Sequence, residues 1–307
     1  MLSRRKFLGS TLAASSALAT SQVAQAQPAK KRTIVDAQVH LWKADSPDYR
    51  WVKGAKPQLP EPFTVERALP MMDEAGVDRV VIVPPGLNDI NDYALGVARR
   101  YPNRFAVMGR IPLENPKSAE RLPKWKEQPG MLGVRVTFNN PTMIGWLSDG
   151  TADWFWPAAE KAGLPVMFLA FGRVNMFDKI AARHPGLPLI IDHMGVNARI
   201  AKKKGIPAAI AQAVALAKYP NVSIKMSNLA SSSLEPYPFK DMTEHLKRVF
   251  DAYGPRRCYW GTDLTNVFAK ATYRQRVTHF TETLDFLSEQ DKDWIMGRAI
   301  LERLKWA

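Results

Sequence analysis

The chain has 307 residues and a formal net charge of +14, which raises the question of a nucleic-acid partner. Its basic residues are scattered through expected helices without a nucleic-acid motif, so they indicate solvated helix faces and no nucleic-acid binding. The single cysteine, Cys258, excludes an intrachain disulfide, and no apolar run approaches the roughly 18 residues of a transmembrane helix.

The first 26 residues have the features of an export signal. Arg4 and Arg5 precede a Phe-Leu pair, a mildly apolar run follows, and residues 24–26 form a small-x-small cleavage site. Adjacent arginines in this context resemble a twin-arginine (Tat) signal. We therefore predict a Tat-type signal peptide at residues 1–26, the Tat export machinery as a partner, and the periplasm as the location. An uncleaved membrane anchor is less favoured because serines break the apolar run, and no stable membrane span is expected.

Residues 34–42 predict the first strand. Because side chains alternate along a strand, Asp36, Gln38 and His40 are expected on one face, with apolar residues on the other. A buried polar face is costly unless each group has a partner or a task. Trp42, at the end of this strand, either lines a substrate pocket or caps the core.

Short β-rich runs alternate with amphipathic segments along the rest of the chain. The expected strands are 34–42, 79–84, 105–111, 132–138, 165–171, 187–194, 222–227 and 258–264. The expected helices are 65–75, 93–101, 154–162, 176–183, 208–218, 244–253 and 274–287. Eight such units favour an α/β fold, a single-domain (β/α)8 TIM barrel over residues 27–307. The runner-up, an open doubly wound sheet, usually has a Gly-rich first turn, which is absent.

Residues 288–304 predict an additional C-terminal helix that closes the fold, with Ser288 as its N-cap. Two histidines, His245 and His279, fall within expected helices, and we interpret both as surface or helix-terminal residues.

Polar residues occur where the expected barrel strands end. In a barrel of this kind the catalytic groups gather at the C-terminal ends of the strands. His40 ends the first expected strand, His193 the sixth and Asp263 the eighth, while Arg135 lies in the fourth and Lys225 in the seventh. Charge at only these places indicates a functional site rather than plain core.

Four short segments form a recognisable set: Asp-Ala-Gln-Val-His at 36–40, Gly-Val-Arg at 133–135, Asp-His-Met-Gly at 192–195, and Trp-Gly-Thr-Asp at 260–263. They resemble the amidohydrolase 2 branch of the amidohydrolase superfamily, a metal-dependent hydrolase family. The resemblance covers essentially the whole chain after the signal. It implies that His40, His193 and Asp263 are the catalytic residues and that Arg135 holds substrate.

Two positions depart from the family pattern. Gln38 stands where the first histidine of Asp-x-His-x-His belongs, and the expected strand 165–171 offers no histidine or lysine ligand. His40, His193 and Asp263 could supply the three protein ligands that a hydrolytic zinc site usually takes. The competing interpretation is a metal-free site, as in lactonases of this branch, with histidines as donors to the carbonyl and the aspartate as general base. The two losses favour no cofactor or one weakly bound divalent metal, of which zinc is the first candidate.

We therefore expect an exported, lactonase-like hydrolase that acts on a small anionic lactone or related ester. Asp263 would activate water, His40 and His193 would polarise the carbonyl or share a metal, and the substrate would contact Arg135, Lys225, Gln38 and Trp42. Two alternatives stay open: a metal-dependent decarboxylase of the same superfamily, and a periplasmic ligand-binding protein that has lost catalysis. The partner is a small-molecule substrate, and a homo-oligomer is left open.

Overall fold

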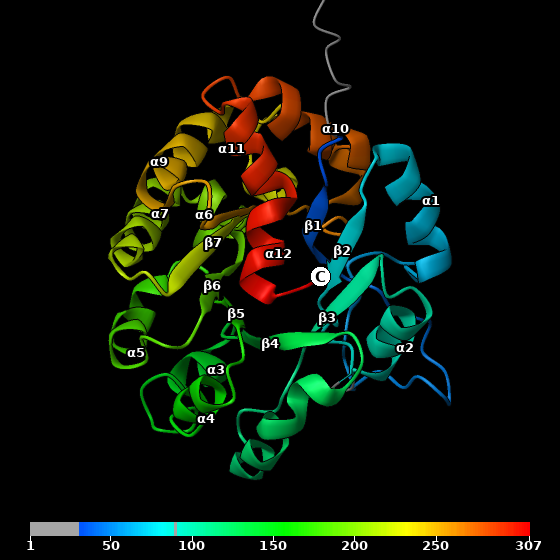
Figure 1. Cartoon of the computed structure of the whole chain (residues 1–307), viewed down its shortest axis with the longest axis vertical. Helices are drawn as coiled ribbons and strands as arrows, with labels where there is room; N and C mark the ends of the chain where they lie inside the picture. Colours follow the sequence, from blue (N-terminus) through cyan, green and yellow to red (C-terminus); the bar gives the residue numbers. More distant parts are fainter. Residues whose placement is uncertain (1–30, 89–90) are drawn as a thin grey trace, which may run out of the picture. The chain divides into compact units, whose positions relative to one another are not determined.

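The computed structural model describes residues 31–88 and 91–307, so the expected signal peptide lies outside the described residues. Within Arg32–Ala307, eight parallel strands form one sheet in the order β1-β2-β3-β4-β5-β6-β7-β8, with helices packed around it (Figure 1). The expected (β/α)8 TIM barrel is confirmed. Among residues 31–88 and 91–307, the helices lack the length and hydrophobicity that a membrane-spanning segment needs.

The strands are short and almost wholly buried. They are β1 (Val35–Val39), β2 (Arg79–Ile82), β3 (Phe105–Gly109), β4 (Met131–Thr137), β5 (Val166–Leu169), β6 (Leu189–Ile191), β7 (Val222–Met226) and β8 (Cys258–Trp260). Every expected strand is present and begins within two residues of its expected start. Each ends earlier than expected, because the last residues leave the sheet and enter the loops at its C-terminal edge.

Twelve α-helices occur in the described part of the chain: α1 (Val65–Ala75), α2 (Asp92–Arg100), α3 (Pro141–Gly145), α4 (Phe155–Lys161), α5 (Asp178–Arg183), α6 (Ala198–Lys202), α7 (Ile206–Ala215), α8 (Leu229–Ser232), α9 (Thr243–Tyr253), α10 (Tyr273–Thr278), α11 (Glu289–Asp293) and α12 (Ala299–Leu304). Helix α1 has its expected bounds and ends at Gly76, whose φ of 75° is the left-handed conformation that glycine adopts freely. The expected helix 274–287 is shorter: α10 passes into a π-helical turn at His279–Thr283.

The C-terminal helices cover one end of the barrel. Ser288 caps α11 in a capping box, as expected, but 288–304 is interrupted by a π-helical turn, Trp294–Arg298, before α12. A Cβ added at Gly297 would lie 2.3 Å from the carbonyl oxygen of Thr33, so only glycine fits against the chain entering β1. Helix α12 lies across the amino-terminal ends of the strands (Figure 1), and the opposite end carries the polar residues.

Asp36 joins the first strand to the last. Its carboxylate accepts hydrogen bonds from the backbone N–H of Thr262 at 2.8 Å, the Thr262 hydroxyl at 2.5 Å and the Tyr273 hydroxyl at 2.8 Å. The backbone N–H of Asp263 adds one bond, to the carbonyl of Gln38 at 3.0 Å. A side-chain carboxylate therefore supplies much of the pairing between β1 and β8.

The expectation that Asp36 shares a face with Gln38 and His40 is wrong. The register of β1 against β2 shifts between Asp36 and Val39. Asp36 pairs with Val80 and Val39 with Ile82, so an advance of three residues on β1 matches two on β2. One extra residue in a strand is a β-bulge, and it turns the following side chains to the other face. Asp36 consequently faces α10, whereas Gln38 and His40 face the barrel interior.

Candidate active site

Four predicted site residues meet at the C-terminal ends of β1, β6 and β8. Nε2 of His40 lies 3.2 Å from Oδ1 of Asp263, and Nε2 of His193 lies 3.7 Å from Oδ2. The side-chain nitrogen of Gln38 lies 3.2 Å from each of these imidazole nitrogens. All four side chains are buried. The barrel therefore assembles one compact polar cluster from segments far apart in the sequence.

The backbone is strained where two of these residues leave their strands. His193 has a φ of 55° and Asp263 a φ of 50°, both in the left-handed region that non-glycine residues rarely occupy. Each such residue costs on the order of 1–3 kcal/mol and persists only where its surroundings hold it. Such strain clusters at functional sites, and here it turns the imidazole and the carboxylate towards each other.

Each imidazole is anchored through its other nitrogen. Nδ1 of His40 lies 2.7 Å from the carbonyl oxygen of Val83, and Nδ1 of His193 lies 2.8 Å from the hydroxyl of Ser227. A carbonyl oxygen only accepts, so Nδ1 of His40 carries a proton. Burial lowers the pKa of His193 to about 4, although the charge of Asp263 opposes this. His193 is therefore neutral at pH 7.

Asp263 is an ionised carboxylate with one unsatisfied oxygen. Burial acts to raise its pKa, but its contacts with His40, His193 and Asn266 hold it well below the usual value. Asn266 reaches Oδ2 at 3.3 Å, whereas no hydrogen bond to Oδ1 is found among the described residues. Asn266 was missed by the sequence analysis; its only signal is its place three residues after Asp263.

A buried ion-pair network lies beneath this cluster. The ammonium group of Lys225 lies 2.7 Å from Oδ1 of Asp192, and Nε of Arg135 lies 3.1 Å from Oδ2. Burial would raise the pKa of Asp192, but these two cations lower it to about 2. Burial lowers the pKa of Lys225, while Asp192 favours its charged form. Lys225 also donates to the side-chain oxygen of Gln38. Its ammonium group is thus already engaged by Asp192 and Gln38, which argues against the expected contact between Lys225 and the substrate.

Arg135 extends from this network to an open space. It donates to the Thr137 hydroxyl at 2.5 Å and lines a cavity of about 180 Å³. The cavity is also lined by residues of the loops after β3 and β4, including Glu114, Met143 and Trp146. Of the residues predicted to contact substrate, Arg135 is therefore the one that faces a described cavity.

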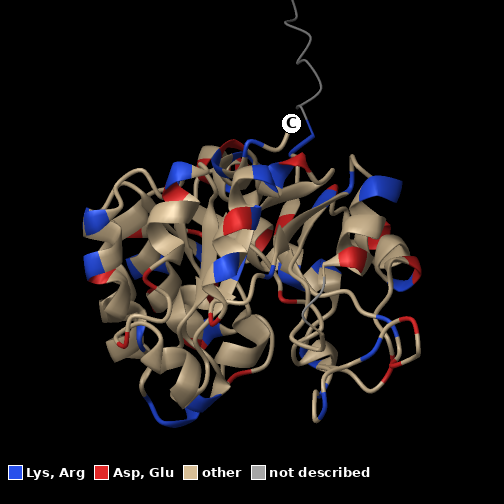
Figure 2. Ribbon diagram, turned by 90° about the horizontal axis from the view of Figure 1, so that it is seen from below, with Lys and Arg blue, Asp and Glu red and all other residues tan. Residues whose placement is uncertain are grey.

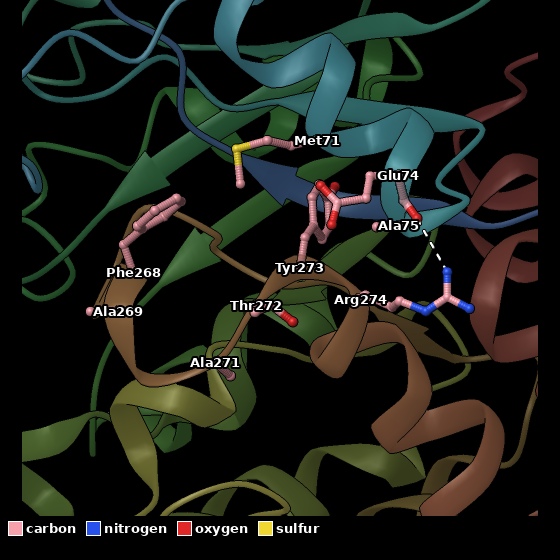
Figure 3. Close-up of a pocket in the computed structure, with 9 residues that line it drawn as sticks. All are labelled: Met71, Glu74, Ala75, Phe268, Ala269, Ala271, Thr272, Tyr273 and Arg274. Carbon is pink, nitrogen blue, oxygen red and sulfur yellow. Dashed lines mark hydrogen bonds between the residues drawn. The ribbon is translucent and has the colours of Figure 1, made fainter.

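Two other features lie apart from the cluster. Trp42 is 1% exposed and packs against Phe63 at a ring-centroid distance of 6.0 Å, so it caps the core. A second cavity, of about 270 Å³, lies between α1 and α10 and is lined by none of the predicted site residues (Figure 3). Its wall includes Tyr273, whose hydroxyl reaches Asp36.

With the Gln38 side chain in its present orientation, Gln38, His40, His193 and Asp263 do not form a suitable zinc site. Zinc would lie about 2.0–2.1 Å from each imidazole nitrogen. Lys225 donates to the amide oxygen of Gln38, so the amide nitrogen faces both imidazoles. The amide hydrogens therefore point to the place where the zinc ion would lie. A turned amide would set its N–H groups against the Lys225 ammonium. Consistently, no group of three or more His, Cys, Asp or Glu able to hold a metal is found across 31–88 and 91–307.

Most of the buried charge near Gln38 is already paired. Arg135 and Lys225 both contact Asp192, so Asp263 is the carboxylate of the cluster left to offset a divalent cation. Excess positive charge in a buried environment is costly.

The fold and this cluster define an amidohydrolase-type barrel. The model of the amidohydrolase family matches residues 35–301, so the chain belongs to this family. The family is often metal-dependent. A search of curated proteins gave no match.

Several solved structures are similar. An amidohydrolase from Burkholderia multivorans, with bound zinc in one crystal form, is 20% identical with a TM-score of 0.75 and covers 89% of this chain and 99% of its own. A probable 2-pyrone-4,6-dicarboxylic acid hydrolase from Acinetobacter baumannii, with citric acid bound, is 19% identical with a TM-score of 0.72 and covers 89% and 99%. 5-Carboxyvanillate decarboxylase from Sphingomonas paucimobilis is 15% identical with a TM-score of 0.64 and covers 90% and 99%. At these identities the likeness concerns the fold alone.

Proposed function

We propose that the protein is a hydrolase of a small anionic lactone or related ester, in which Asp263 activates the attacking water. One observation carries the proposal: Oδ1 of Asp263 belongs to an ionised, buried carboxylate, lacks a hydrogen bond from the described residues and lies 3.2 Å from Nε2 of His40. An acceptor without a partner is available to bind the attacking water. A buried base with a free lone pair is the requirement for general-base catalysis.

The reaction follows from these groups. A water proton passes to Oδ1 of Asp263 while the water oxygen forms a bond to the carbonyl carbon. The carbon–oxygen bond of the ester then breaks, and the departing alkoxide takes this proton from Asp263. In this proposal His40 is not the donor to the carbonyl that the sequence led us to expect, since its Nδ1 proton is held by Val83.

The anionic character of the substrate is supported by Arg135, which lines a cavity and is joined to the cluster through Asp192 and Lys225. A guanidinium group pairs well with a carboxylate. Lactones are activated esters, so their hydrolysis does not require a strong Lewis acid. The similar fold of the probable dicarboxylic acid hydrolase, whose name denotes an anionic substrate, agrees with this class. We propose that the chemistry needs no tightly bound metal, because the Gln38 amide faces the two imidazoles.

Replacing Asp263 by asparagine tests the proposal. The asparagine side chain keeps the shape and the bond to Asn266 but loses the negative charge that accepts the water proton. Turnover of the lactones hydrolysed by the wild-type protein should fall by about 10²–10⁴-fold, the usual range for general-base catalysis. The measurement is kcat over a panel of carboxylated lactones, with circular dichroism as the check on folding.

The matched control is His245→Ala, which changes a half-buried histidine on α9, away from the cluster. Its turnover should equal that of the wild type. A folded Asp263→Asn variant with near-normal kcat would refute the proposed role of Asp263. A wild-type protein that turns over no member of the panel would refute the substrate class.

We also propose that the protein is exported to the periplasm through its twin arginines. The support is the sequence alone, the Arg4-Arg5 pair and the cleavage site at 24–26.

A further inference from the structure

Lys225 occupies an unusual position for a lysine. It lies within β7, is 0% exposed, and its ammonium nitrogen contacts Asp192 at 2.7 Å, the sulfur of Met167 at 3.4 Å and the side-chain oxygen of Gln38. Lysine is almost never fully buried unless it is paired. Its pairing with Asp192, which also contacts Arg135, accounts for the buried charge of Lys225. That pairing does not explain why the ammonium group also bonds to Gln38.

That bond decides which way the Gln38 amide points. An ammonium group is only a donor, so it selects the amide oxygen and leaves the amide nitrogen facing the other way. There the nitrogen meets Nε2 of His40 and Nε2 of His193, both at 3.2 Å. One amide N–H group is available for each imidazole.

The amide in turn decides where each histidine carries its proton. A nitrogen that accepts from an N–H has no proton of its own, so both Nε2 atoms are bare and both protons lie on Nδ1. The partners of Nδ1 agree with this, since Val83 offers a carbonyl oxygen and Ser227 a hydroxyl oxygen. The bare Nε2 atoms face the carboxylate of Asp263.

We propose that Lys225 is a positioning residue that acts through Gln38. It holds the amide with its N–H groups towards His40 and His193, keeps both imidazoles in the Nδ1-protonated form, and closes the position where a metal ion would bind. This inference rests on the proposed function only in calling the cluster an active site, because the geometry itself involves no substrate.

The first experiment reads the histidine protons directly. In the full-length ¹⁵N-histidine-labelled protein, NMR at pH 7 should show His40 and His193 with bare Nε2 atoms. In Lys225→Met the amide is free to turn its oxygen towards the imidazoles, so the Nε2-protonated form should appear for at least one of them. Lys247→Met, which changes an exposed lysine on α9, is the matched control and should leave both signals unchanged.

Loss of Lys225 alone leaves Asp192 with one cation fewer, and breaking a buried pair costs about 3–5 kcal/mol. The double variant Asp192→Asn/Lys225→Met removes both charges and keeps the cluster neutral. It should show the same change of tautomer as Lys225→Met. A folded variant of either kind in which His40 and His193 both stay protonated on Nδ1 alone would overturn the proposal.

The second experiment uses zinc alone as the probe. Zinc affinity is measured by competition with a chelating dye, and partners that orient metal ligands typically change affinity by about 10–100-fold. Affinity should rise at least about tenfold in the double variant and further in Gln38→His/Asp192→Asn/Lys225→Met, with no rise in Lys247→Met. Wild-type protein that binds zinc as tightly as these variants would overturn the metal-excluding role. Neither readout depends on turnover, so a failure here is distinct from a failure of the lactone assay.

Discussion

Asp192 stabilises the folded chain through its two cations, and the effect depends on pH. The pKa of its carboxyl falls from a usual 3.8 to about 2 in the folded protein. A group with a depressed folded pKa contributes stability that is fully present above the unfolded pKa. That contribution is lost as the pH falls from about 4 through about 2.

We therefore predict that the stability gap between the wild type and Asp192→Asn narrows on acidification. Asparagine mimics the protonated acid, so the difference in free energy of unfolding should shrink by about 2 kcal/mol between about pH 5 and pH 2. Urea denaturation at several pH values measures it. A gap that stays constant over this interval would show that Asp192 is not ionised and paired in the folded protein.

At the scale of single residues, sequence reasoning located the reacting groups but not their contacts. His40, His193 and Asp263 could be placed together because all three end strands of one barrel. The bond between Lys225 and Gln38 joins residues 187 positions apart, and no local pattern shows it. His279 was expected at a surface or helix-terminal position; it does end α10, but it is 1% exposed and contacts the rings of Phe239 and Phe280, because a π-helical turn begins there.

Among the elements, strand and helix positions were predictable where the hydrophobic period was regular, as in α1. The 3₁₀ helix at Pro116–Glu127 could not be predicted in this way. Its two prolines remove backbone donors, and its hydrophobic period differs from that of an α-helix. The bulge in β1 was equally invisible, since an extra residue changes the facing of Asp36 without changing the composition of the strand.

The contact between β1 and β8 gives a prediction at this scale. Asp36→Ala removes the acceptor of Gln38 N–H, Thr262 N–H, the Thr262 hydroxyl and the Tyr273 hydroxyl. A buried donor left without a partner costs about 1–3 kcal/mol, so the variant should lose at least about 3 kcal/mol of unfolding free energy. Tyr273→Phe removes one of these bonds and should lose about 1–2 kcal/mol.

Urea denaturation of the two variants measures the difference. Equal losses in Asp36→Ala and Tyr273→Phe would mean that Asp36 matters only through the tyrosine and does not hold the strands together.

At the scale of the whole molecule, the positive charge is dispersed. Lys and Arg are distributed over many helices and loops of the barrel and interspersed with Asp and Glu, with no single basic stripe in this view of the described residues (Figure 2). This pattern agrees with solvated helix faces as the main location of the excess charge.

The proposed export concerns the whole chain, and the twin arginines provide its test. In Arg4→Lys/Arg5→Lys the precursor should remain in the cytoplasm, because the pair is what the Tat machinery recognises. Cell fractionation with immunoblotting measures the distribution. Lys6→Gln, which keeps both arginines, is the control and should be exported normally. Processed periplasmic protein from the double-lysine variant would exclude the Tat route.

The carboxylate of Asp36 also has a consequence for the order of folding. It bonds to Thr262, 226 positions further along the chain, and such distant contacts close late because the loop between them costs entropy. During synthesis β1 cannot pair with β8 until β8 has emerged from the ribosome, and the Asp36 carboxylate stays solvated until then. Gln38 and His40 stand on one side of this junction and Asp263 on the other. We therefore expect the barrel and its reactive cluster to be completed in the same late step, so that a chain folded before export would leave the cytoplasm with its chemistry already assembled.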